Sequence, residues 1–170
     1  MAPYLRRTWH PRGQTPLLKQ RTRHHLKVSI IAALVVSPQG RRVRWCFRLH
    51  VQKSIVAALV QAFLRQMGRW VRGPVIVVWD RLKAHRAVSV QQFIGRHRRF
   101  RIEWLPAYAP ELNPVEYGWS WLKTNPLANQ APQEIEPLRQ LAHRQARRLQ
   151  HQPGLLRSFL KHSPLSLCHK

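Results

Sequence analysis

VIVVWD, at residues 75–80, is the stretch that decides the fold class of this chain. It follows the turn-forming pair Gly73-Pro74 and places five apolar residues in succession before Asp80. A continuous apolar run of this length is typical of a parallel strand that is buried on both faces, near the centre of a sheet. In open α/β folds, ligands gather beyond the carboxyl ends of such strands, which is where Asp80 lies. The stretch therefore predicts a central strand that ends in a functional carboxylate; an ion-paired or capping Asp is the alternative.

The residues before this strand predict a hairpin and a helix. Residues 27–37 (KVSIIAALVVS) are apolar and β-branched, and residues 41–50 (RRVRWCFRLH) alternate between apolar and mostly basic side chains. Because Pro38-Gln39-Gly40 supplies a turn between them, the two segments are expected to pair as antiparallel strands. In residues 52–67 the apolar positions recur at the spacing of one helical face, and Gly68 is placed as a stop signal.

The residues after the strand predict alternating helices and strands. A helix and an alternating strand come first, and a loop with three prolines follows. The next helix begins at Pro114 with Asn113 as its cap, and two further helical segments end the chain. The predicted ranges are 87–98, 100–105, 106–114, 114–123, 132–150 and 155–160.

This order predicts an α/β fold with a mixed β-sheet flanked by helices. Residues 1–26 are basic and aperiodic, so we expect a loop or arm there, followed by a core over residues 27–125 and a C-terminal helical extension over residues 126–170. Trp79 and Trp104 lie in predicted strands and are expected in the core. Trp119 and Trp121 are expected to pack their helix onto the sheet.

The charge balance indicates a polyanionic partner. Thirty Lys and Arg residues face six Asp and Glu residues, for a net charge of +24. Such a field attracts nucleic acid, although a ribosomal-type or merely basic protein would have the same composition. Clusters of arginine are the candidates for phosphate contacts, but no single residue can be chosen among them. They lie at Arg21 and Arg23, at Arg41, Arg42 and Arg44, and in residues 96–101 and 144–148.

Composition also argues against several classes of protein. Cys46 and Cys168 form no CxxC pair, so neither a disulfide framework nor a zinc site is indicated, and a reducing cytoplasm is compatible with the chain. The longest apolar run, residues 30–36, is far too short to span a membrane. We therefore expect a cytoplasmic protein with no membrane partner.

Residues 105–123, LPAYAPELNPVEYGWSWLK, resemble the signature around the third acid of Tc/mariner-type insertion-sequence transposases. The core of that signature is Leu-Asn-Pro-Ile/Val-Glu, which residues 112–116 match. Residues 75–85 (VIVVWDRLKAH) resemble the strand that carries the second acid, and 35 residues (81 to 115) separate the two acids. Arg7-Thr8-Trp9 and residues 13–16 resemble the loop after the first acidic strand. The resemblance covers residues 7 to about 123.

The resemblance implies an RNase H-like fold and a DDE catalytic site. In this family three carboxylates hold two Mg²⁺ ions, for which Mn²⁺ can substitute, because hard cations prefer oxygen ligands. Water first nicks the DNA at the element end, and the freed 3′-OH then attacks target DNA. Asp80 would be the second acid and Glu116 the third, both as catalytic residues and metal ligands. Asn113 and Pro114 would fix the helix start that aims Glu116, and His85 would lie at the edge of the site.

Each of these residues has a simpler alternative. Glu116 lies where any helix favours a carboxylate, in its first turn, and His85 could be a surface histidine. The resemblance also implies DNA partners, namely the element ends and the target, with a homodimer or a full-length transposase as a possible protein partner. It places the protein in a prokaryotic cytoplasm, in association with the nucleoid.

The sequence departs from the family in one decisive way. Residues 1–79 contain no Asp or Glu, so the first acid and the strand that bears it are expected to be lacking. A smaller departure is Arg81, where Asn is common in the family. We therefore expect a transposase fragment that is inactive alone. The alternatives are a non-catalytic relic that binds DNA or a full-length transposase, and an unrelated basic RNA-binding protein.

Overall fold

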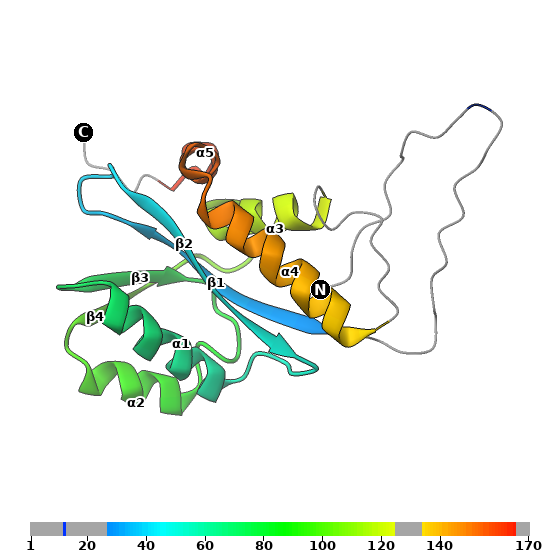
Figure 1. The fold of residues 1–170 in the computed structure, drawn as a ribbon. Helices are drawn as coiled ribbons and strands as arrows, with labels where there is room; N and C mark the ends of the chain where they lie inside the picture. The colour runs from blue at the N-terminus through cyan, green and yellow to red at the C-terminus, as the bar shows by residue number, and fades with distance from the viewer. Residues whose placement is uncertain (1–11, 13–26, 125–133, 166–170) are drawn as a thin grey trace.

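The computed structural model describes residues 12, 27–124 and 134–165 of the chain. The predicted arm at residues 1–26, which includes Arg21 and Arg23, lies outside the described residues except for Arg12. Cys168 lies outside them as well. Four strands, five α-helices and a short 3₁₀ helix make up the described part (Figure 1). They are β1 (Val28–Val36), β2 (Val43–Val51), α1 (Ala57–Trp70), β3 (Val75–Trp79), α2 (Val88–Arg96), β4 (Phe100–Trp104), η1 (Pro110–Leu112), α3 (Pro114–Thr124), α4 (Ile135–Gln150) and α5 (Pro153–His162).

The strands pair as two small sheets in the described part of the chain. β1 and β2 form the predicted antiparallel hairpin, with Val28 opposite Val51 and Val36 opposite Val43. β3 and β4 are parallel, as expected for the VIVVWD strand. The expected mixed sheet is thus divided among the described residues into an antiparallel pair and a parallel pair, with no ladder between them.

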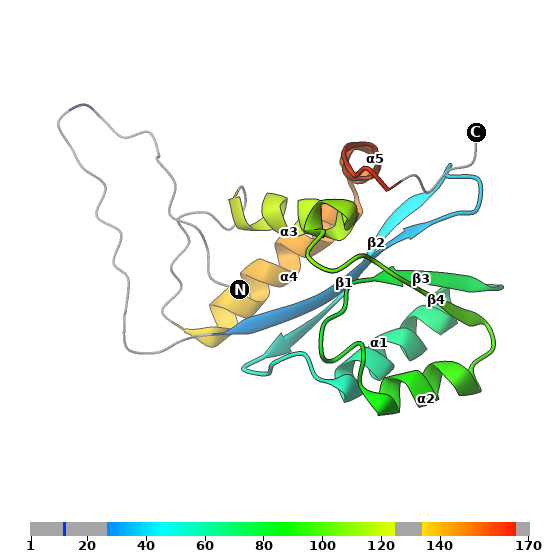
Figure 2. The ribbon, with the colours of Figure 1, turned by 180° about the vertical axis from the view of Figure 1, so that it is seen from behind.

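The helices lie on two sides of these strands. Figures 1 and 2 show α1 and α2 together on one side, and α3, α4 and α5 on the other. Under α1 and α2, the core is built from apolar residues of those helices and of β3 and β4; its buried members are Val60, Leu64, Trp79, Val90, Phe93, Ile94 and Phe100. This packing fixes the direction in which β3 presents Asp80.

A second core lies between the hairpin and the last three helices. Trp45 of β2 is 1% exposed, and it contacts the buried side chains of Leu122, Leu149 and Leu156. Gln150 of α4 donates a hydrogen bond to the carbonyl oxygen of Trp45, with Nε2 2.7 Å from that oxygen. Helices α4 and α5 therefore share one core with β2 and α3, the helix that carries Glu116.

Two expectations about burial are wrong. Ile76 of β3 is 63% exposed, so β3 is not buried on both faces along its whole length. Trp104 is 36% exposed, whereas Trp79 is buried as predicted. Trp119 does pack as predicted, since its ring meets that of Trp45 edge to face, with centroids 5.3 Å apart.

The bounds of α1 also differ from the prediction. The helix begins at Ala57, after Val56, which is extended; Gln52, where the prediction began the helix, has a positive φ of 50°. Gly68 does not end the helix, which runs on to Trp70. A Cβ on Gly68 would lie 3.5 Å from the ring of Phe100, an ordinary van der Waals distance, so the contact with β4 does not require a glycine.

Candidate active site

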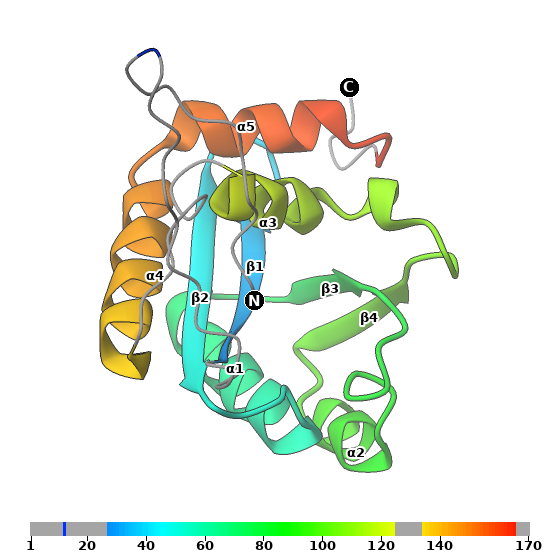
Figure 3. The ribbon, with the colours of Figure 1, turned by 90° about the vertical axis from the view of Figure 1, so that its right-hand side faces the viewer.

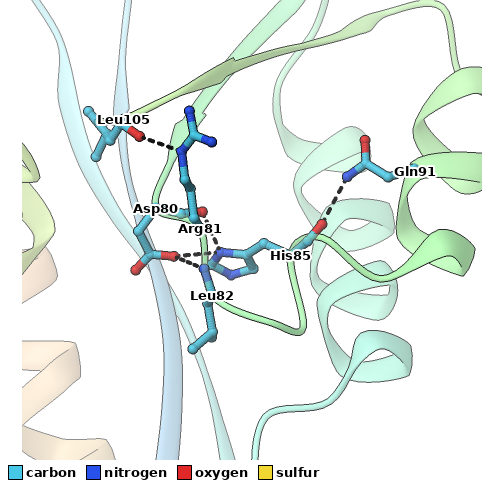
Figure 4. A network of polar contacts seen from close by, with 6 residues as sticks. All are labelled: Asp80, Arg81, Leu82, His85, Gln91 and Leu105. Atoms are coloured by element: carbon cyan, nitrogen blue, oxygen red, sulfur yellow. Dashed lines mark hydrogen bonds and ion pairs between the residues drawn. The ribbon is translucent and has the colours of Figure 1, made fainter. Parts of the chain in front are cut away.

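Asp80 follows the last residue of β3, at the carboxyl end of the parallel pair. The strand is fixed there by Leu105, whose N–H donates to the carbonyl oxygen of Trp79 at 3.0 Å. Oδ1 of Asp80 accepts hydrogen bonds from the backbone N–H of Leu82 at 3.0 Å and from Nδ1 of His85 at 2.8 Å (Figure 4). One carboxylate oxygen is therefore held by two donors, while no hydrogen bond among the described residues uses Oδ2.

His85 is held in place from three directions. Its ring stacks on Trp79, with centroids 4.4 Å apart and an interplanar angle of 5°. Its carbonyl oxygen accepts a hydrogen bond from Nε2 of Gln91 at 2.9 Å (Figure 4). Nδ1 lies near two oxygens of Asp80, the carboxylate Oδ1 and the carbonyl oxygen at 3.3 Å. Because both are acceptors, Nδ1 carries the proton.

This arrangement favours an ionised Asp80. The hydrogen bond from His85 lowers the pKa of the Asp80 carboxyl; burial opposes this effect, and the Leu82 N–H adds to the lowering. The charge on Asp80 is thus stabilised before any ligand arrives.

Glu116 lies in the first turn of α3, as predicted. Oδ1 of Asn113 accepts a hydrogen bond from the Val115 N–H at 3.2 Å, and the Glu116 N–H donates to the carbonyl oxygen of Asn113 at 3.0 Å. Pro114, at the first helical position, is buried. Asn113 and Pro114 therefore form the helix start that the sequence predicts, and the carboxylate that they aim reaches solvent.

The negative charge of Asp80 influences the ionisation of Glu116. Partial burial raises the pKa of Glu116, Lys123 opposes the rise, and the negative charge of Asp80 adds to it. The charge of Asp80 thus acts on Glu116, although 35 residues (81 to 115) separate the two acids in sequence.

Ser163 supports the loop before α3, and sequence reasoning missed it. Its side chain is buried, and Oγ donates a hydrogen bond to the carbonyl oxygen of Leu112 at 3.0 Å. Close by, the Tyr117 hydroxyl donates to the carbonyl oxygen of His162 at 3.1 Å. No local pattern could have revealed these contacts, because they join α3 to the end of α5, 45 to 51 residues away.

A sequence profile of the DDE superfamily endonuclease family matches residues 1–139. This chain belongs to the DDE superfamily endonuclease family. A comparison with curated protein sequences finds no match.

Solved structures of transposases have a fold similar to that of this chain. The Mos1 transposase paired-end complex with left transposon end matches with a TM-score of 0.58 and 18% identity, over 96% of this chain and 52% of that chain. The Mos1 mariner paired-end complex with Mn matches with a TM-score of 0.56 and 18% identity, over 96% and 51%. The Mos1 strand transfer complex matches with a TM-score of 0.54 and 19% identity, over 95% and 50%. The fold is RNase H-like, and the DDE chain spans about half the length of these transposases.

Asp80 and Glu116 are the two carboxylates at this site, and the described residues contain no group of three or more His, Cys, Asp or Glu side chains that could hold a metal ion. Oδ2 of Asp80 and the Glu116 carboxylate make no hydrogen bond to described residues. Both are hard oxygen donors of the kind that Mg²⁺ and Mn²⁺ prefer. The donor chemistry therefore fits a divalent cation, with part of its ligand shell supplied by these two side chains.

The arginines that were candidates for phosphate contacts differ in their hydrogen bonds and their exposure. Arg99 points inward: its guanidinium donates to the carbonyl oxygens of Gly68, Val71 and Gly73 at the end of α1. Arg101 is paired with Glu103, with Nε 2.9 Å from Oε1. In residues 96–101, Arg96, Arg98 and Arg101 are exposed. No helix in the described part of the chain is long and apolar enough to cross a membrane.

Proposed function

We propose that this chain is part of the catalytic domain of a DNA transposase, in which Asp80 and Glu116 are the second and third acids of the DDE site. The observation that carries the proposal is the placement of the two carboxylates, one just after the carboxyl end of β3 and one in the first turn of α3, where the charge of Asp80 acts on Glu116. The electrostatic coupling between them supports a shared ligand, because two anionic side chains are brought together most readily around a cation.

A divalent cation at these residues would act as a Lewis acid in phosphoryl transfer. Asp80 would bind it through Oδ2, since His85 and the Leu82 N–H occupy Oδ1. His85 would be a positioning residue that keeps the Asp80 carboxylate in one orientation. Asn113 and Pro114 would do the same for Glu116 by fixing the helix start. By the family resemblance the intact site takes two Mg²⁺ or Mn²⁺ ions; the similar Mos1 mariner complex contains Mn.

DNA is the proposed substrate. The matched Mos1 structures are a paired-end complex with a transposon end and a strand transfer complex, and a net charge of +24 suits binding to phosphates. We further propose that element ends and target DNA are the partners, with a second copy or a full-length transposase as protein partner, in the cytoplasm and nucleoid of a prokaryote. Family membership leaves no support for an unrelated RNA-binding protein.

We also propose that the 170-residue chain is inactive alone, because residues 1–79 offer no carboxylate as a third metal ligand. The test is a nicking assay on supercoiled DNA with Mn²⁺, beside Mn²⁺ binding followed by electron paramagnetic resonance. We expect background nicking, but Mn²⁺ binding that is weakened by Asp80→Ala and Glu116→Ala and left unchanged by Glu103→Ala. Robust nicking that Asp80→Ala abolishes would refute inactivity, and equal Mn²⁺ binding by all variants would refute the metal site.

A non-catalytic relic that binds DNA or a full-length transposase is the second candidate. The sparse set of acids favours it for the isolated chain, because DNA binding needs none of them. It predicts salt-dependent DNA binding that Asp80→Ala and Glu116→Ala leave intact or strengthen.

A further inference from the structure

Tyr108 is the most exposed large hydrophobic side chain in the described part of the chain. Its relative exposure is 101%, and its ring makes no aromatic contact with described residues. Its backbone has a positive φ of 59°, in the left-handed region that a residue with a Cβ rarely adopts. A large aromatic side chain held in solvent on a strained backbone is typical of a functional position and not of a structural one.

The loop that carries Tyr108 is anchored beside both acids. At its start, the Leu105 N–H donates to Trp79, and Nε of Arg81 donates to the Leu105 carbonyl oxygen at 3.3 Å (Figure 4). At its end, Ser163 holds Leu112 just before the start of α3. In Figure 3 this loop, between β4 and α3, projects from the molecule on the side on which β3 and β4 end. The loop that carries Tyr108 therefore forms a rim between the end of β3, which is followed by Asp80, and the start of α3, which carries Glu116.

The surroundings of this rim combine apolar and basic side chains. Leu82 and Trp104 are 48% and 36% exposed, and both lie next to the strand ends. Arg81, Lys83 and Arg86 are exposed on the loop that begins at Asp80. Aromatic rings combined with positive charges bind single-stranded nucleic acid, because bases stack on the rings while the charges follow the phosphates.

We infer that the ring of Tyr108 stacks on an unpaired base of the DNA strand that enters the Asp80–Glu116 site. The inference rests on the proposed function for its substrate, DNA. An unpaired base is specified because the faces of a base within a duplex are already covered by its neighbours, whereas one at an end or outside the stack offers a free face. Stacking there would hold the strand beside the carboxylates.

The test compares two DNA probes in EDTA, with the full 170-residue chain. One is a blunt duplex, and the other is the same duplex with a short single-stranded overhang that contains 2-aminopurine, whose fluorescence falls on stacking. We expect Tyr108→Ala to weaken binding of the overhang probe by about tenfold, as loss of one stacked base implies, and to abolish the quenching. Tyr108→Phe keeps the ring and should retain both.

Trp70→Ala is the matched control, because Trp70 is 51% exposed at the end of α1, next to the start of β3 and not its end. It should change neither signal. Tyr108→Ala is expected to fold normally, since the side chain is fully exposed. Unchanged overhang binding by Tyr108→Ala, or an equal loss on the blunt duplex, would overturn the inference. Mn²⁺ binding at the acids is measured separately, so a failure of the proposed metal site would not affect the interpretation of the Tyr108 experiment. Absence of all DNA binding would count against both the proposed function and the stacking of Tyr108 on DNA.

Discussion

The imidazole of His85 stacks on the indole of Trp79, with ring centroids 4.4 Å apart and planes 5° from parallel. Trp79 immediately precedes Asp80, and the same imidazole donates its Nδ1 proton to the Asp80 carboxylate at 2.8 Å. Trp79, which is buried at the end of β3, thus orients His85, and His85 in turn orients the Asp80 carboxylate. His85 consequently belongs to the support of the carboxylate and is not an independent surface residue.

Replacement of His85 should raise the pKa of Asp80. In His85→Ala the strongest influence that lowers this pKa is lost, while burial, which raises it, remains. Asp80 is the only Asp in the chain, so a ¹³C-Asp label reports its carboxyl alone in an NMR titration. His97→Ala is the matched control, since His97 also stacks on an aromatic ring and bonds a carbonyl oxygen, but touches no acid. An equal Asp80 pKa in wild type and His85→Ala would contradict the assignment.

The same shift sets a pH window for stability. Because the folded-state pKa of Asp80 lies below its unfolded value of about 3.9, its contribution is present above that pH and is lost as the pH falls through the folded value. Urea unfolding of the wild type and His85→Ala should therefore differ more at pH 6 than at pH 2.

Gly118→Ala should destabilise the protein through a clash with Trp45. A Cβ on Gly118 would lie 2.6 and 2.7 Å from two ring atoms of Trp45, which is 1% exposed and cannot move aside. Overpacking of this kind costs roughly 1–3 kcal/mol. Gly95→Ala in α2 is the control, because nothing lies within 4 Å of its Cβ, and a gain of about 0.5–1 kcal/mol is expected there. Urea unfolding measures both; no loss in Gly118→Ala would show that the α3–β2 packing is looser than described.

Local patterns predicted the end of the strand at Asp80 and the helix start at Asn113-Pro114, because strand ends and helix starts are local features. Placement alone did not distinguish Glu116 from Glu111; the family resemblance of residues 112–116 made that choice. The mistakes arose where the local pattern does not decide the outcome. Gly68 lies inside α1 and does not end it, and Ile76 is 63% exposed although it lies in a continuous apolar run.

The support of the Glu116 helix was unpredictable for the same reason. Ser163 reaches Leu112 only because α5 packs on α3 through the core around Trp45, and no spacing in the sequence encodes that meeting. Similarly, the exposure of Tyr108 depends on a backbone with positive φ, which its residue type does not suggest.

Ser163→Ala should loosen the start of α3. The variant loses the hydrogen bond from a buried hydroxyl to the Leu112 carbonyl oxygen, at a cost of about 0.5–1.5 kcal/mol. We expect faster hydrogen exchange of the Glu116 amide, which bonds Asn113. Ser158→Ala is the control, since its hydroxyl bonds only Leu155 within α5 among the described residues. If both variants exchange the Glu116 amide at the wild-type rate, Ser163 does not position this helix.

Asp80→Asn should lower the pKa of Glu116. The charge of Asp80 contributes to the raised pKa of Glu116, so its removal makes ionisation of Glu116 easier, while the effect of burial remains. A ¹³C-Glu label, with the Glu116 signal assigned from its loss in Glu116→Gln, follows the titration. Glu103→Gln removes a carboxylate that pairs with Arg101 and should leave the Glu116 pKa unchanged.

The raised pKa of Glu116 also determines the direction in which the free energy of unfolding changes with pH. Its folded-state pKa lies above the unfolded value, so the favourable contribution is present below about pH 4.3 and is lost as the pH rises through the folded value. Glu116→Gln should therefore be more stable than the wild type at pH 7, and this advantage should vanish at pH 3. An Asp80→Asn variant with an unchanged Glu116 pKa would mean that the two carboxylates lie too far apart to share a cation, and the proposed site would fail with it.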